Sequence, residues 1–233
     1  MIIGYGSIGK RHLRNIESIE KTEIIVCTKR KDLNSLKRKN IKIFPTIEKC
    51  ISEKPDFAVI TNETAYHITS AIKLAKNGID LFIEKPLSNS NKNVKLLEKI
   101  VKEKKLVTQM GFNLRFHECI KKIKQLVNQK KIGKIISIQC QNGSYLPDWH
   151  PHEDYRQSYA GKQKLGGGII LTMIHDIDYL YWIFGQVKQV FSVAGKYSDL
   201  DISAEDYCAS IIRFKNKITA EIHLDFFLRP EFR

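Results

Sequence analysis

A glycine-rich turn lies within the first ten residues of the chain, between two segments of opposite character. Ile2 and Ile3 suit a buried strand, and a helix-like segment covers residues 10–19. The turn between them reads Gly4-Tyr5-Gly6-Ser7-Ile8-Gly9. In such a turn the first glycine allows the tight change of direction, the second lets a pyrophosphate approach the backbone, and the third lets the helix pack against the strand. The first N–H groups of the helix then face the phosphates. The opening of the chain therefore predicts a strand–turn–helix unit that binds a dinucleotide.

Strand-like and helix-like segments alternate through the first half of the chain. Short apolar runs that indicate buried strands lie at 23–28, 41–44, 56–61, 79–84 and 106–111. Helical periodicity is found at 65–77 and 91–104. Repeated strand–helix units imply right-handed crossovers and a doubly wound parallel sheet. We expect an α/β fold with a Rossmann domain over residues 1–112 and ligands at the carboxyl ends of its strands.

The pattern changes after residue 112. Helix-like segments lie at 117–129 and 169–184, and an irregular polar and aromatic stretch covers 146–165. Strand-like segments lie at 134–145, 187–196, 206–214 and 218–227. Since no helix separates the last three, they predict a largely antiparallel sheet. We expect a second, α+β domain over residues 113–233.

Cysteine usage and charge limit the partners that we expect. The five cysteines are odd in number and scattered, and they match neither a zinc pattern nor a disulfide framework. No signal peptide and no apolar run of membrane-spanning length is visible. The net charge of +14 is that of many nucleic-acid binders. However, the lysines are spread along amphipathic segments such as 92–105 and 121–131, which favours solvated helix faces or attraction of anionic substrates. We therefore expect a cytoplasmic protein without nucleic-acid or membrane partners.

The end of the second predicted strand bears on the choice of cofactor. An acid at this place bonds the ribose 2′-hydroxyl and repels a 2′-phosphate. The sequence instead reads Thr28-Lys29-Arg30, and the nearest acid, Asp32, comes later. Thr28 can donate a hydrogen bond, and the two cations can meet a phosphate. This favours NADP(H) over NAD(H), although Lys29 and Arg30 also suit the start of a polar loop.

Polar residues gather where the later strands of the first half end. The groups are Thr61-Asn62 with His67, Glu84-Lys85-Pro86, and Asn113 with Arg115. Each group follows a carboxyl edge, where function rather than packing is expected. Farther along, Gly166–Gly168 opens a helix on which Thr172, His175 and Asp178 follow at intervals of one turn.

Together these motifs resemble the Gfo/Idh/MocA family of nicotinamide-dependent oxidoreductases, and the resemblance covers essentially the whole chain. The family implies hydride transfer between the cofactor and a hydroxyl or ketone of a sugar, sugar derivative or nucleotide sugar. It also implies a large, open, mostly antiparallel sheet in the second domain and a tendency to form homo-oligomers. The stretch 145–156 is similar to members associated with surface-sugar biosynthesis.

The resemblance assigns the chemistry to Lys85, as the lysine of Glu-Lys-Pro, and to His175, as the proton-transfer histidine. A histidine can accept a proton near neutral pH, and a lysine ammonium can polarise an oxygen. The expected cofactor-binding residues are Gly4, Gly6, Ser7, Ile8, Gly9, Thr28, Lys29, Arg30, Thr61, Asn62, His67, Glu84 and Lys85. The expected substrate-binding residues are Asn113, Arg115, Trp149, Tyr155, Arg156, Thr172 and Asp176.

The sequence departs from the family pattern in three ways, and two of them, Thr172 and the early stop of the chain, keep an alternative function open. Thr172 stands where many members carry an aspartate, and a threonine cannot act as a base. The first strand is short, and the chain stops at Arg233, where members usually continue with further strands. The alternative is a catalytically degraded nucleotide-binding protein that serves as a sensor or assembly partner.

Single residues also have more than one interpretation. His67 suits a structural role as well as a cofactor contact, and Arg115 can bind a substrate anion or pair with an interior acid. The stretch His150–Asp154 contains residue types that bind zinc. Because it lies in a polar loop without a supporting helix or paired cysteines, we expect no metal site.

Overall fold

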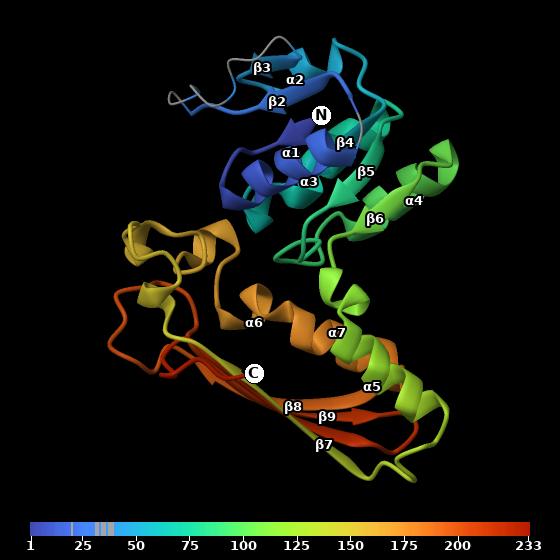
Figure 1. Cartoon of the computed structure of the whole chain (residues 1–233), viewed down its shortest axis with the longest axis vertical. Coiled ribbons are helices and arrows are strands. Elements are labelled where there is room, and N and C mark those ends of the chain that lie inside the picture. The colour runs from blue at the N-terminus through green and yellow to red at the C-terminus, as the bar shows by residue number, and fades with distance from the viewer. Residues whose placement is uncertain (20, 31–32, 34–35, 37–39) are drawn as a thin grey trace. The chain divides into compact units, whose positions relative to one another are not determined.

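The computed structural model describes residues 1–19, 21–30, 33, 36 and 40–233, so Asp32 lies outside the described residues. The chain forms two compact units, Met1–Gly111 and Phe112–Arg233, each with its own hydrophobic core (Figure 1). Within the described residues, no helix has both the length and the apolar character that a membrane span requires.

The first unit is built on a six-stranded parallel sheet. Its strands are β1 (Ile2–Ile3), β2 (Ile24–Cys27), β3 (Ile41–Phe44), β4 (Phe57–Ile60), β5 (Asp80–Ile83) and β6 (Thr108–Met110). Their order in space is β3-β2-β1-β4-β5-β6, and every pair is parallel. The strand order therefore reverses between β1 and β4. Doubly wound folds bind their ligands at such a reversal, beyond the carboxyl ends of the strands.

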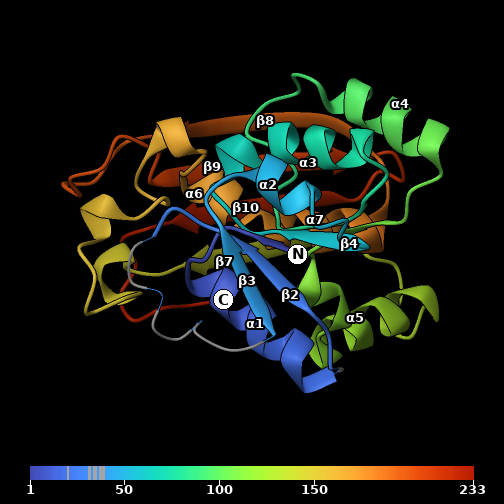
Figure 2. The ribbon, with the colours of Figure 1, turned by 90° about the horizontal axis from the view of Figure 1, so that it is seen from above.

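Successive side chains of these strands enter two different cores. Ile2, Val26 and Val59 pack on one face with Leu13 of α1 (Ser7–Ile19). Their neighbours in sequence pack on the other face, which is covered by α2 (Ile47–Ile51), α3 (His67–Lys76) and α4 (Val94–Lys104). Figure 2 shows α1 on one side of β2 and β3 and α3 on the other. Because both faces are covered, the strands are nearly continuous apolar runs.

The second unit combines a four-stranded sheet with three helices. The strands are β7 (Ser137–Gly143), β8 (Val187–Gly195), β9 (Tyr207–Phe214) and β10 (Thr219–Asp225), in the order β7-β10-β9-β8. The helices are α5 (Glu118–Asn128), α6 (Ile169–Thr172) and α7 (Ile174–Phe184). The pairs β8–β9 and β9–β10 are antiparallel, whereas β7 and β10 are parallel. The predicted fold class, a Rossmann-like sheet with an α+β unit, is confirmed, and its second sheet is mixed.

Several element boundaries differ from the sequence-based expectation. The expected helix over 169–184 is interrupted at Met173, whose backbone (φ −94°, ψ 24°) leaves the helical region between α6 and α7. Helix α2 was not anticipated, since five residues are too few to show a periodicity; Thr46 caps it by accepting a hydrogen bond from the Lys49 N–H (3.4 Å). The irregular stretch after β7 contains short 3₁₀ turns at Leu146–Asp148, Tyr155–Gln157 and Gln163–Leu165.

Candidate functional site

The glycine turn connects the carboxyl end of β1 to α1. Gly4 has a φ of +89°, and a Cβ atom there would lie 2.8 Å from the backbone of Asn62. A Cβ atom on Gly9 would collide with the carbonyl oxygen of Gly4. At Gly6, by contrast, no atom of the described residues lies within 4 Å of the Cβ position, its two chain neighbours aside. The turn itself therefore requires Gly4 and Gly9, whereas Gly6 borders open space that a ligand can occupy. Ser7, the first residue of α1, is exposed, and the next residue, Ile8, is half-buried.

The chain leaving β4 is bound directly to this turn. The Thr61 hydroxyl lies within hydrogen-bond distance of the carbonyl oxygens of Ile3 (2.9 Å) and Gly4 (3.0 Å). Asn62 donates a hydrogen bond from Nδ2 to Ser70 Oγ (3.2 Å). Its Oδ1 is buried and has no hydrogen-bond partner among the described residues. Such an atom costs about 1–3 kcal/mol, so it suits a donor supplied by a bound molecule.

His67 lies at the start of α3 and is 1% exposed. Its Nδ1 is 2.7 Å from the Pro86 carbonyl oxygen, and its Nε2 is 2.8 Å from the Asn62 carbonyl oxygen. Because a carbonyl oxygen only accepts, a ring nitrogen that carries a proton donates it to the carbonyl oxygen that it faces. The ring therefore joins the loop after β4 to the loop after β5, which favours the structural interpretation of His67.

Glu84 and Lys85 follow β5, and the Lys85–Pro86 peptide bond is cis. Glu84 Oε1 lies 2.7 Å from Nε2 of His12 on α1, and Glu84 Oε2 accepts a hydrogen bond from the Lys85 N–H (3.2 Å). Burial acts to raise the pKa of the Glu84 carboxyl, yet the hydrogen bond and charge of His12, with the Lys85 N–H, hold that pKa below its ordinary value. His12 was not among the residues expected at this site. Its position one turn after Gly9 was the available signal, since residues three apart share a helix face.

The loop after β2 carries the residues expected to select the cofactor. Thr28 Oγ1 accepts a hydrogen bond from the Arg30 N–H (3.2 Å). Lys29 and Arg30 are both exposed at the carboxyl edge of the sheet. The first unit thus brings the glycine turn, the polar residues after β4 and β5, and these two cations to the same edge.

In the second unit, Thr172 and His175 lie on either side of the helix interruption. Thr172, the last residue of α6, is buried. His175, in the first turn of α7, is half-buried, and its ring meets that of Phe112 edge-on with 6.0 Å between centroids.

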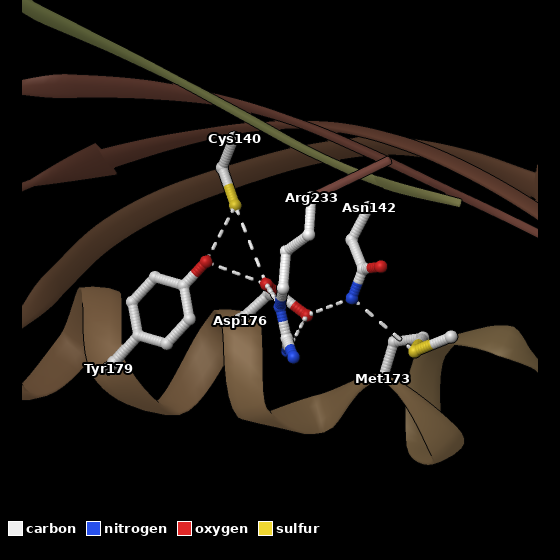
Figure 3. A network of polar contacts seen from close by, with 6 residues as sticks. All are labelled: Cys140, Asn142, Met173, Asp176, Tyr179 and Arg233. Atoms are coloured by element: carbon white, nitrogen blue, oxygen red, sulfur yellow. Dashed lines mark hydrogen bonds and ion pairs between the residues drawn. The ribbon is translucent and has the colours of Figure 1, made fainter. Parts of the chain in front are cut away.

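Asp176, for which a substrate-binding role is expected, does not face solvent and binds other side chains of the second unit. Its exposed fraction is 0%, and Figure 3 shows its carboxylate enclosed by side chains from β7, α7 and the end of the chain. Oδ2 accepts from Asn142 Nδ2 (2.7 Å) and Arg233 Nη2 (2.9 Å), and Oδ1 accepts from the Tyr179 hydroxyl (2.6 Å). Burial, reinforced by the Asp176 charge, raises the pKa of Tyr179, so this phenol remains a donor. Asp176 therefore links α7 to the sheet.

Arg115 also binds within the chain. Its guanidinium makes a two-pronged pair with Asp178, with Nε 2.8 Å from Oδ2 and Nη2 2.5 Å from Oδ1. It lies over the rings of Phe112 and Trp182. Two roles are expected for Arg115, binding of a substrate anion and pairing with an interior acid. In the structure Arg115 is paired with the acid Asp178.

The remaining residues expected to bind substrate lie in the 3₁₀ turns or, for Trp149, directly after one. The Trp149 indole N–H donates to Ser144 Oγ (2.7 Å), and the Tyr155 hydroxyl accepts from the Asp201 N–H (3.3 Å). Arg156 pairs with Asp154 through Nε (2.8 Å) and Nη2 (2.9 Å). Asn113 is exposed where the 3₁₀ turn Asn113–Phe116 begins. Trp149, Tyr155 and Arg156 thus each have a partner within the second unit. In the described part of the chain, no three His, Cys, Asp or Glu side chains are arranged to hold a metal ion.

Two family models match nearly the whole chain. The model described as "Oxidoreductase family, NAD-binding Rossmann fold" matches residues 1–112, and "GFO/IDH/MocA C-terminal domain" matches residues 120–233. The chain belongs to the Gfo/Idh/MocA family. The resemblance seen in the sequence is thereby confirmed.

Three relatives illustrate how this Gfo/Idh/MocA chain compares with known proteins. It is 28% identical over 228 residues to myo-inositol 2-dehydrogenase of Thermotoga maritima, a match that covers 92% of this chain and 64% of the relative. The crystal structure of a probable dehydrogenase from Thermotoga maritima is 27% identical with a TM-score of 0.79, covering 97% of this chain and 68% of that one. The structure of the WlbA dehydrogenase of Bordetella pertussis, crystallised with NADH and UDP-GlcNAcA, matches this chain with a TM-score of 0.88 at 19% identity. The match covers 99% of this chain and 67% of that one. This last likeness concerns the fold. The chain thus spans about two thirds of the length of these proteins.

Proposed function

We propose that this chain is an NAD(P)-dependent oxidoreductase that transfers hydride between a nicotinamide cofactor and a hydroxyl or ketone of a sugar-type substrate. The observation that carries the proposal is the open Gly6 position at the reversal of strand order, with Lys85 at the end of a nearby strand of the same sheet. A tight turn alone would not need space above its central glycine, whereas a pyrophosphate does.

The residues at this edge fit a dinucleotide. The first N–H groups of α1 would hold the phosphates. Asn62 Oδ1, which has no partner in the described part of the chain, would accept a hydrogen bond from the bound molecule. Lys29 and Arg30, exposed after β2, would meet a 2′-phosphate, so we propose a preference for NADP(H) over NAD(H). The bound cofactor supplies or accepts the hydride.

The chain's own residues would handle the oxygen and its proton. The Lys85 ammonium would stabilise negative charge on the substrate oxygen, and the His175 imidazole would take up or return the hydroxyl proton. Thr172 carries no charge and is buried, so it would act only through its hydroxyl. Cyclic polyols and nucleotide sugars are the first substrates to test, because the names of the relatives include both classes. We also propose a cytoplasmic location, supported by five free thiols, and a homo-oligomer, supported by Phe191 and Ile211 exposed on the sheet.

The deciding experiment is a titration of the purified protein with NADPH and NADH, followed by nicotinamide fluorescence. We expect saturable binding that favours NADPH and weakens about 10-fold in Arg30→Asp, which replaces a phosphate contact by a repulsion. Lys188→Asp makes the same charge change on β8 and should leave binding unaltered. Turnover is then tested with myo-inositol and UDP-GlcNAcA, with Lys85→Ala as the inactive control.

Two results would argue against this function. Binding of neither cofactor by a folded protein would refute the dinucleotide site. Cofactor binding without turnover of any polyol or nucleotide sugar would favour the alternative, a nucleotide-binding sensor or assembly partner, for which Thr172 in place of an acid is the specific observation.

A further inference from the structure

Lys85 is flanked in sequence by two residues that are each held by a histidine. Before it, the Glu84 carboxylate contacts His12 Nε2 at 2.7 Å. After it, the Pro86 carbonyl oxygen contacts His67 Nδ1 at 2.7 Å. The two histidines belong to different helices, α1 and α3, which pack on opposite faces of the sheet (Figure 2). One short loop is therefore held from both sides.

The Glu84 carboxylate is closely confined. One oxygen contacts His12 and the other accepts the Lys85 N–H, and both side chains of the His12–Glu84 pair are only 18% exposed. A Cβ atom on Gly111, the residue after β6, would lie 2.9 Å from Glu84 Oε2. The carboxylate thus fills the space left by a glycine, and it fixes the direction of the Lys85 backbone N–H.

Both histidines also connect this loop to the phosphate-binding turn. His12 lies on the helix that begins in that turn. The second nitrogen of His67 contacts the carbonyl oxygen of Asn62 (2.8 Å), whose backbone would touch any side chain at Gly4. The glycine turn and the backbone that carries Lys85 are consequently parts of one hydrogen-bonded frame.

We propose that His12 and His67 are positioning residues for Lys85. His12 acts by holding the Glu84 carboxylate against the Lys85 N–H, and His67 acts by holding the Pro86 carbonyl. The inference rests on the proposed function, in which the Lys85 ammonium meets the substrate oxygen. Small displacements of a reacting group cost about 100-fold in rate, so a frame of this kind has a direct kinetic consequence.

The test compares His12→Leu with His12→Gln, which restores a hydrogen-bond donor near the position of Nε2. The first readout needs no turnover. It is the extent of reductive methylation of Lys85, which is measured by peptide mass spectrometry and divided by that of the exposed Lys95 on α4. Lys85 is half-buried, and a looser loop makes its side chain more accessible, so we expect the Lys85 to Lys95 ratio to rise about 3-fold or more in His12→Leu. It should return toward the wild-type value in His12→Gln. His152→Leu, an exposed loop histidine of the second unit, is the matched control and should change nothing.

Kinetics and a double variant give the second and third readouts. In His12→Leu we expect kcat to fall about 10-fold or more, while KM and the affinity for NADH change by less than about 3-fold. Because His12 acts through Glu84, adding His12→Leu to Glu84→Met should cause no further loss. The pair His67→Leu and His67→Gln is expected to behave as the His12 pair does.

An unchanged Lys85 labelling ratio in both leucine variants overturns the inference, and so does a loss of NADH binding equal to the loss of kcat. If the wild-type protein binds NADH but turns over no substrate, the proposed function fails, while the labelling ratio still decides the positioning role. Should a leucine variant not fold, Asn replaces Leu and the same ratio is measured.

Discussion

Replacing the buried Asp176 by alanine should destabilise the second unit without any direct effect on a substrate. The carboxylate is wholly enclosed and accepts hydrogen bonds from Asn142, Tyr179 and Arg233 (Figure 3). The matched control is Asp154→Ala, since Asp154 also pairs with an arginine through two contacts but lies at the surface.

The size of the effect follows from what each partner loses. The buried Asn142 amide loses its oxygen acceptor and keeps only the weak contact with Met173 Sδ (3.4 Å), which costs about 1–3 kcal/mol. The Tyr179 hydroxyl loses a bond worth about 1 kcal/mol but keeps its contact with Cys140. The Arg233 side chain is 44% exposed and can turn to water, so its term is about 0–1 kcal/mol. Removal of a buried charge offsets part of this sum. We expect a net loss of about 2–4 kcal/mol, against less than about 1 kcal/mol for Asp154→Ala.

Urea unfolding followed by tryptophan fluorescence measures this loss in the relevant unit. The chain has two tryptophans, Trp149 and Trp182, and both lie in the second unit. Trp149 packs edge-on against Phe226, so its emission responds to the loss of packing. With a denaturant slope of about 2 kcal/mol per molar, the midpoint should fall by about 1–2 M urea.

The reasoning fails if the free energies of unfolding of Asp176→Ala and Asp154→Ala differ by less than about 0.5 kcal/mol, since ordinary surface substitutions have effects of that size. A stable Asp176→Ala protein whose KM alone rises would return Asp176 to the substrate-binding role expected from the sequence.

Three further predictions concern other parts of the chain. Gly6→Ala should leave the melting temperature of the first unit unchanged, because the added Cβ enters open space. The same Cβ takes up the space of the pyrophosphate, so NADH binding should weaken about 10-fold or more in a fluorescence titration. Gly9→Ala, whose Cβ meets the Gly4 carbonyl, should instead lower the melting temperature. Burial acts to raise the pKa of Asp206, but the Ser198 hydroxyl and backbone N–H groups hold it below the ordinary value. The ionised Asp206 therefore adds to the free energy of unfolding above about pH 4, and this contribution is lost as the pH falls through the lower folded pKa. The free energy of unfolding of Asp206→Asn should consequently depend less on pH between about pH 4 and 2 than that of the wild type. An unchanged pH dependence would refute this. Arg115→Leu should cost about 1–3 kcal/mol in urea unfolding by stripping Asp178 of its partner; a loss too small to measure would mean that the pair is loose in solution.

The fold was predictable from local patterns in the sequence. The central strands β1, β2 and β4 are continuous apolar runs, and the break at residue 112 separates alternating strand–helix units from a β-rich segment. The residues after β4 and β5 could be grouped because parallel strands bring their carboxyl ends to one edge. These inferences need only periodicity and the chirality of crossovers.

Long-range side-chain partners could not be predicted in this way. His12 and Glu84 are separated by 72 residues, and Arg115 and Asp178 by 63. Asp176 looks from its helix position like a substrate ligand, and only the packing of α7 against β7 reveals that its carboxylate is enclosed. A polar residue has the same sequence signature whether it meets a ligand or another part of the chain.

The parallel pairing of β7 with β10 has a consequence for synthesis on the ribosome. The first strand of that sheet to be made pairs with the last, so β7 waits while residues 144–218 are added. At about 5–20 residues per second this takes about 4 to 15 s, during which β7 remains an unpaired edge open to other chains. The six strands of the first unit, in contrast, are complete by residue 110. The first unit can therefore fold as it emerges, whereas the sheet of the second unit can form only after β10 has been made.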